Sequence, residues 1–153
     1  MTEQTYAFEH GPYLQMAVFC EKILQERDGV ISVIRVIDRV NRTATGPEAP
    51  EAMPSFDYQL TTVITLKSGR ARGGVQVEIE PELPSGLRQP RAAMTAQMEG
   101  NERGQNLIMN LQMKFEEPGV YWFNVYADGR IITRLPFTVT YSRISGASAP
   151  RLG

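Results

Sequence analysis

The sequence predicts an all-β fold, an antiparallel β-sandwich of about eight short strands. The first observation is an alternation of period two near the C-terminus, where every second side chain is apolar, namely Leu107, Met109, Leu111, Met113 and Phe115. The second is a pair of tight-turn signals, Pro118-Gly119 and Asp128-Gly129, that separate apolar runs. The third is the near-regular spacing of such runs along the chain. Strands that alternate in this way bury one face, so this region predicts a half-buried antiparallel sheet.

The N-terminal part begins with residues 1–12, which are mostly polar and predict a flexible lead-in. The segment Met16–Gln25 fits two structures. Its apolar residues recur at i, i+3, i+4, i+7 and i+8, which is typical of a short amphipathic helix. However, Asp28-Gly29 is a dipeptide favoured in hairpin turns, and the β-branched run Val30–Ile37 beyond it predicts a strand. Propensity alone slightly favours the helix, so a short N-terminal helix stays open at this point.

The middle of the chain alternates strands with proline-rich connections. Arg39–Ser55 holds three prolines and a glycine, which predicts a long connection, either a crossing between sheets or a functional loop. After the turn at 67–74, Val75–Ile79 predicts a strand with a solvated acidic side at Glu78 and Glu80. Before that turn, Gln59–Leu66 predicts a strand with one face formed by Leu60, Thr62, Ile64 and Leu66.

Three prolines and a glycine between residues 81 and 90 break the chain again, and Ala92–Met98 predicts a weaker strand before the C-terminal set. The chain therefore predicts a single β-sandwich domain over residues 13–143. The small and polar residues 144–153 predict a disordered tail.

Composition excludes several classes of function. The 153 residues carry a formal net charge of −1, so no global field attracts nucleic acid or anionic lipid, and neither partner is expected. No run approaches the roughly 18 apolar residues of a membrane-spanning helix. The single cysteine, Cys20, excludes an intramolecular disulfide, and the N-terminus lacks the basic and apolar regions of a secretory signal. We therefore expect a cytoplasmic protein.

The residue types that carry catalysis or bind metals are scarce. His10 is the only histidine and lies in the lead-in, while Cys20 sits in an apolar run typical of a buried thiol. One histidine and one cysteine cannot form a transition-metal site, and the four aspartates show no calcium-binding spacing. The acidic pair Glu78 and Glu80 is more simply explained as a solvated sheet face. We expect no metal, no cofactor and no enzymatic activity.

Arginines and exposed aromatics are the candidate contact residues. Arg70 and Arg72 lie in a glycine-rich turn and Arg88 and Arg91 on a proline-rich connection, where they either contact a partner or keep a sheet edge soluble. If Tyr121 and its alternate neighbours face the core, the rings of Trp122 and Tyr126 project outward, as in surfaces that bind protein or sugar. With the opposite parity, Trp122 is a core residue, and the sequence leaves both readings open.

Two stretches together resemble a group of small, uncharacterised bacterial proteins. One runs from Cys20-Glu21-Lys22-Ile23-Leu24 through Asp28-Gly29 and Ser32 to Val36-Ile37-Asp38-Arg39-Val40. The other joins Pro118-Gly119-Val120-Tyr121-Trp122-Phe123 to Asp128-Gly129 and Leu135-Pro136-Phe137-Thr138-Val139. The resemblance covers most of residues 14–142 and implies an immunoglobulin-like or C2-like β-sandwich. It also implies that Met16–Gln25 is a strand, and it carries no catalytic residue.

These observations favour a non-enzymatic protein-interaction module. Its contacts would come from the loops 41–56 and 81–91, from the face around Trp122 and Tyr126, or from a sheet edge that pairs with a protein partner or a second copy. The alternative is a sandwich that binds a small ligand or carbohydrate on its exposed aromatics.

Overall fold

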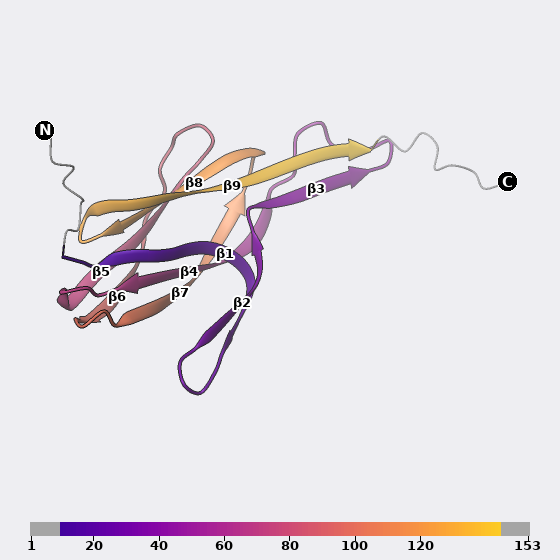
Figure 1. The fold of residues 1–153 in the computed structure, drawn as a ribbon. Coiled ribbons are helices and arrows are strands. Elements are labelled where there is room, and N and C mark those ends of the chain that lie inside the picture. The colour runs from indigo at the N-terminus through magenta and orange to yellow at the C-terminus, as the bar shows by residue number, and fades with distance from the viewer. Residues whose placement is uncertain (1–9, 145–153) are drawn as a thin grey trace, which may run out of the picture.

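The computed structural model describes residues 10–144, which form nine strands in two sheets packed face to face (Figure 1). The four-stranded sheet has the order β2-β1-β4-β7 and contains β1 (Tyr13–Gln25), β2 (Ile31–Ile37), β4 (Phe56–Lys67) and β7 (Gly104–Phe115). The five-stranded sheet has the order β3-β9-β8-β5-β6 and contains β3 (Arg39–Thr45), β9 (Arg130–Ile144), β8 (Gly119–Ala127), β5 (Arg72–Glu82) and β6 (Ala92–Glu99). The all-β sandwich predicted from the sequence is confirmed.

The core lies between the two sheets and follows the predicted alternation. The inward side chains of β7 are the row from Leu107 to Phe115, all of them buried. Phe115 lies at the centre of an aromatic cluster, 4.8 Å from the ring of Tyr121 and 5.9 Å from that of Phe137 between ring centroids. The predicted inward face of β4 is also buried, although Thr62 Oγ1 has no hydrogen-bond partner among the described residues.

The short N-terminal helix left open for Met16–Gln25 is wrong, because this segment forms most of strand β1, up to its last residue. β1 pairs with β2 on one side and β4 on the other, so its inward Phe19 reaches the core while Cys20 faces outward. Both faces of this strand are apolar, which removes the period-two signal and leaves a pattern that imitates a helix. The strand implied by the family resemblance is confirmed.

The long connection Arg39–Ser55 contains a strand that the sequence did not reveal. Its first seven residues form β3, which pairs in parallel with β9, so the sandwich is not wholly antiparallel and has nine strands rather than about eight. β3 is an edge strand whose side chains are mostly exposed, and it therefore lacks an alternating pattern. The remaining residues fold back over the sandwich, with Met53 buried and the Tyr141 hydroxyl donating to the Pro50 carbonyl at 2.6 Å.

The predicted lead-in and tail fall mostly outside the described residues, which exclude 1–9 and 145–153. The last residues of the lead-in are held against the β4–β5 turn, where the His10 carbonyl accepts a hydrogen bond from the Arg70 amide at 2.8 Å. Gly11 has a φ of +98°, and a Cβ there would lie 2.0 Å from the Ser68 carbonyl oxygen. Only glycine allows this close approach.

Candidate interaction surface

The outer face of the five-stranded sheet carries the predicted aromatic pair. Tyr121, Phe123 and Val125 of β8 are fully buried in the core, so the alternate residues Trp122 and Tyr126 point outward. Of the two orientations of β8 that the sequence left open, the structure has the one in which Trp122 faces away from the core.

Glu80 on β5 lies at the centre of a polar network on this face. Although the sequence predicts a solvated carboxylate, the residue is only 6% exposed. Arg91 Nε donates to its Oε2 at 3.0 Å, and the Tyr126 hydroxyl and Asn124 Nδ2 donate to its Oε1 at 3.0 and 3.3 Å. Arg88 approaches the same carboxylate at 3.6 Å. Two of the predicted arginines and one predicted aromatic therefore meet on a single acidic residue.

The network continues along β8 towards Trp122. Arg134 of β9 donates to Asn124 Oδ1 at 2.8 Å and to Glu82 Oε2 at 3.2 Å. Its guanidinium lies over the Trp122 ring at 4.5 Å from the centroid, as that of Arg91 lies over the Tyr126 ring at 3.9 Å. Each of these half-buried, outward-facing rings therefore has one face covered by a cation of the same chain.

The electrostatics of this network keep Glu80 ionised. Burial would raise the pKa of this carboxyl, but the hydrogen bonds from Arg91, Tyr126 and Asn124, together with the Arg91 charge, outweigh burial and hold the pKa below its ordinary value. Burial and the neighbouring carboxylate raise the pKa of the Tyr126 hydroxyl. A carboxylate held in this state accepts hydrogen bonds and is poorly suited to act as a general acid.

The predicted contact loop 81–91 is tied to the sheet by the same network and by its own backbone. The Gln89 amide donates to the Pro81 carbonyl at 2.9 Å, and the Leu83 amide donates to the Leu87 carbonyl at 2.8 Å. These hydrogen bonds hold the loop against the C-terminal end of β5.

The other predicted arginines lie apart from this network. Arg70 is exposed in the β4–β5 turn, and Arg72 begins β5. Arg72 stands eight residues before Glu80 on the same strand, a separation of about 26 Å at the usual rise of a strand. The structure thus joins Trp122, Tyr126, Arg88 and Arg91 but leaves Arg70 and Arg72 outside.

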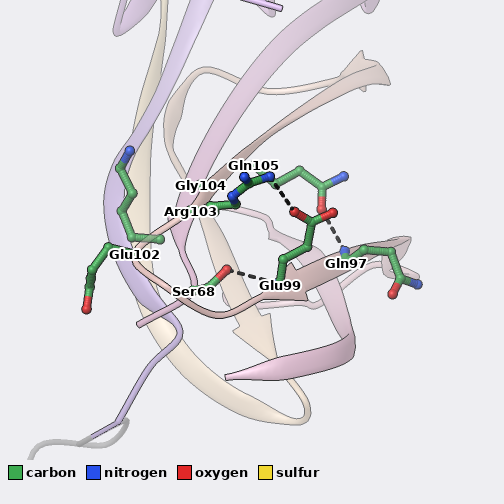
Figure 2. A pocket seen from close by; sticks show the side chains of 8 residues that line it. Ser68, Gln97, Glu99, Glu102, Arg103, Gly104 and Gln105 are labelled. Atoms are coloured by element: carbon green, nitrogen blue, oxygen red, sulfur yellow. Dashed lines mark hydrogen bonds and ion pairs between the residues drawn. The ribbon is translucent and has the colours of Figure 1, made fainter. Parts of the chain in front are cut away.

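A polar depression of about 480 Å³ lies where the β4–β5 and β6–β7 turns meet (Figure 2). Some of its polar groups pair with one another: Arg103 pairs with Glu99 at 3.2 Å, and Gln105 Oε1 accepts from the Gln97 backbone amide at 2.6 Å (Figure 2). The buried Ser68 hydroxyl accepts from the Glu99 amide at 3.3 Å and contacts a methionine sulfur rather than a base. Within residues 10–144, no group of three acidic, histidine or cysteine side chains could hold a metal ion.

The outer face of the four-stranded sheet is a surface that sequence reasoning missed. Because Leu60, Ile64 and Leu66 of β4 point into the core, the alternate residues of β4 and their strand partners point outward. The apolar members of this surface, which we call the neutral face, are Met16, Val18, Cys20, Val36, Val63 and Ile108.

Register places the central side chains of the neutral face in one row across three strands, with Val63 between Val18 and Ile108. Val63 is fully buried although it points away from the core. Cys20 is 2% exposed, and burial raises the pKa of its thiol, as the sequence suggested for a small buried apolar residue. The neutral face is thus a closely packed apolar platform.

Two hydrogen-bonded pairs of polar side chains border this row. The Thr61 hydroxyl donates to Asn110 Oδ1 at 3.0 Å, and the Thr65 hydroxyl donates to Asn106 Oδ1 at 2.7 Å. Both pairs join β4 to β7 across the sheet. The hydroxyl protons therefore already have acceptors within the chain.

The neutral face continues into a hairpin that projects beyond the sheet (Figure 1). Within the described residues, β1 past Cys20 has its strand partners in β2 alone, so this part is a two-stranded ribbon. Its turn is the predicted Asp28-Gly29, with the Val30 amide donating to Asp28 Oδ1 at 3.0 Å. Leu24, Val30 and Val36 on the ribbon are 45%, 56% and 64% exposed. Aliphatic side chains on a ribbon with a single partner strand need an additional covering surface.

The comparison with protein families agrees with the resemblance seen in the sequence. The profile of DUF6941, a family of unknown function, matches residues 15–140. No curated protein matches the chain. A solved structure that is similar to it is an immunoglobulin-like protein from Pseudomonas aeruginosa, with 11% sequence identity and a TM-score of 0.38 over 84% of this chain and 96% of that chain. No helix within residues 10–144 is long and apolar enough to span a membrane.

Proposed function

The chain belongs to the DUF6941 family of unknown function, and we propose that it is a non-enzymatic protein-interaction module. The observation that carries this proposal is the neutral face together with the exposed aliphatic side chains of the β1–β2 hairpin. An apolar sheet surface next to a ribbon with exposed Leu24, Val30 and Val36 is typical of a surface that another polypeptide covers.

The breadth of this surface favours a protein over a small molecule. Small ligands bind in concave pockets that bury most of their surface, whereas a sheet face presents a broad platform. The aromatic face is also less suited to stacking on sugar rings, because Arg134 and Arg91 already cover Trp122 and Tyr126. We therefore propose that the partner binds the neutral face and not the aromatic face expected from the sequence.

The test is site-specific photo-crosslinking in the native host. A photoreactive amino acid replaces Val36, which is 64% exposed on the neutral face, and in a control strain replaces Thr95, which is exposed on strand β6 of the other sheet. Irradiation is expected to yield a discrete polypeptide adduct from position 36 and none from position 95. The absence of an adduct at position 36, or equal adducts at both positions, would overturn the proposal.

A further inference from the structure

We propose that the partner of the neutral face is a second copy of this chain, packed about a two-fold axis with the outer faces of the two four-stranded sheets in contact. This inference rests on the proposed function. The charge, the area and the shape of the neutral face favour a second copy over another partner.

The charge of the face suits contact with itself. A two-fold interface brings each patch against an identical patch, so any net charge would meet its own sign. Along the outward positions of β1 from Met16 to Leu24, Lys22 is the only charged residue, and its long stem allows the ammonium group to stay in water. The central row Val18, Val63 and Ile108 carries no charge.

Burial of the polar border costs little. The hydroxyls of Thr61 and Thr65 donate within the chain, which leaves the side-chain amides of Asn110 and Asn106 free to donate across the axis. A partner would therefore not need to supply acceptors for these two hydroxyl groups.

The area is that of a stable interface. Strands β1, β4 and β7 lie side by side over about eight residues, which at about 4.8 Å between strands and 3.3 Å per residue span roughly 14 by 26 Å. The two-stranded ribbon beyond Cys20 adds roughly 10 by 17 Å. The two parts together offer about 500 Å² per copy, so a pair of copies buries about 1,000 Å², near the lower bound for a specific interface.

The shape of the face provides both a projection and a recess. A hollow of about 300 Å³ lies where the hairpin leaves the sheet, and Lys22, Thr61, Ile108 and Asn110 are among the residues that line it. In a two-fold arrangement the ribbon of each copy can approach the hollow of the other.

The edge of β2 is a less suitable route to a dimer. Arg35, in the middle of β2, has a φ of +54° and forms an ion pair with Glu21 at 2.8 Å. A left-handed residue interrupts the regular row of amides and carbonyls that edge-to-edge pairing requires. Face-to-face packing avoids this interruption.

The experiment is light scattering after size exclusion on the whole chain, from 1 to 200 µM, with matched substitutions. Wild type is expected at twice the chain mass of 17.1 kDa. Val36→Lys and Ile108→Lys, tested separately, each place one cation on the neutral face of each copy. Each is expected to raise the dimer Kd about 100-fold or more. Val120→Lys, at a valine that is 41% exposed on the other sheet, is expected to leave the dimer intact.

Circular dichroism and thermal unfolding establish whether each variant is folded. If Ile108→Lys does not fold, Val36→Lys alone tests the inference, because Val36 is the more exposed residue. A monomeric wild type at 200 µM, or equal dissociation by Val36→Lys and Val120→Lys, would overturn the inference. The crosslinked adduct separates the two proposals. An adduct of twice the chain mass supports both, whereas an adduct with another protein supports the proposed function and refutes the homodimer.

Discussion

Replacing Glu80 by glutamine tests whether the outer face of the five-stranded sheet is held by its charged network. The substitution keeps the size of the side chain and an oxygen that can still accept from Tyr126 and Asn124. It removes the negative charge that Arg91 meets at 3.0 Å and Arg88 at 3.6 Å. The loop carrying both arginines would then cover a neutral side chain.

The magnitude follows from the burial of the two partners. A hydrogen bond to a charged group contributes about 1.5–3 kcal/mol, and breaking a fully buried ion pair costs about 3–5 kcal/mol. The Glu80 side chain is 8% exposed, but that of Arg91 is 35% exposed, so water partly replaces the lost partner. We therefore expect Glu80→Gln to lower the free energy of unfolding by about 1–2 kcal/mol, which corresponds to roughly 2–8 °C in Tm.

The assay is urea unfolding of wild type, Glu80→Gln, Arg91→Gln and the double variant. The double-mutant cycle is expected to give a coupling free energy of about 1 kcal/mol between positions 80 and 91. Glu116→Gln, at an exposed carboxylate beside the β7–β8 turn, is the control and is expected to change stability by less than about 0.5 kcal/mol. A coupling indistinguishable from zero, or equal losses in Glu80→Gln and Glu116→Gln, would refute the role assigned to the network.

Two further predictions follow from the same face and from the core. Because the folded-state pKa of Glu80 lies below its ordinary value, its carboxylate stabilises the fold fully above the unfolded pKa of about 4.3, and this stabilisation is lost as the pH falls through the folded pKa. The stability gap between wild type and Glu80→Gln should therefore narrow when urea midpoints are compared between pH 7 and pH 3, and a constant gap would contradict the reasoning. Thr62→Val replaces a core hydroxyl that lacks a partner among the described residues, and is expected to raise the free energy of unfolding by about 1 kcal/mol. A loss of stability in the same urea assay would show that the hydroxyl does have a partner.

Alternation revealed the strands whose two faces differ, β-branched residues revealed β2, β1 stayed open between helix and strand, and β3 was missed. β7 was evident because Leu107 to Phe115 alternate with solvated residues along its whole length. β1 has apolar residues on both faces, so the residue spacing alone pointed to a helix. β3 is mostly exposed, and it becomes a strand through its parallel pairing with β9, a contact between segments about 100 residues apart that no local pattern encodes.

The charged network was present in the sequence only as separate pieces. The acidic residues of β5 and the aromatic residues of β8 each alternate, but their register, with Glu80 opposite Asn124 and Glu82 opposite Trp122, comes from strand pairing. A carboxylate expected to be solvated is therefore buried by side chains from β8 and the following loop. The signal that could have suggested the network is a pair of alternating rows. One row is the acidic residues of β5, the other is the aromatic and amide residues of β8, and arginines follow each row in the sequence.

The two outer faces of the sandwich differ in how their polar groups are satisfied, and our choice between them as the proposed contact surface follows from this difference. On the five-stranded sheet, Glu80 and its arginines neutralise one another, and a partner would have to disrupt charge pairs to approach the rings beneath. On the four-stranded sheet, Val18 and Ile108 are half-buried and Val36 is 64% exposed, and the hydroxyls that border them already have acceptors. Covering the second face would release water from apolar surface without breaking an ion pair, and for this reason we propose the contact there rather than on the aromatic face.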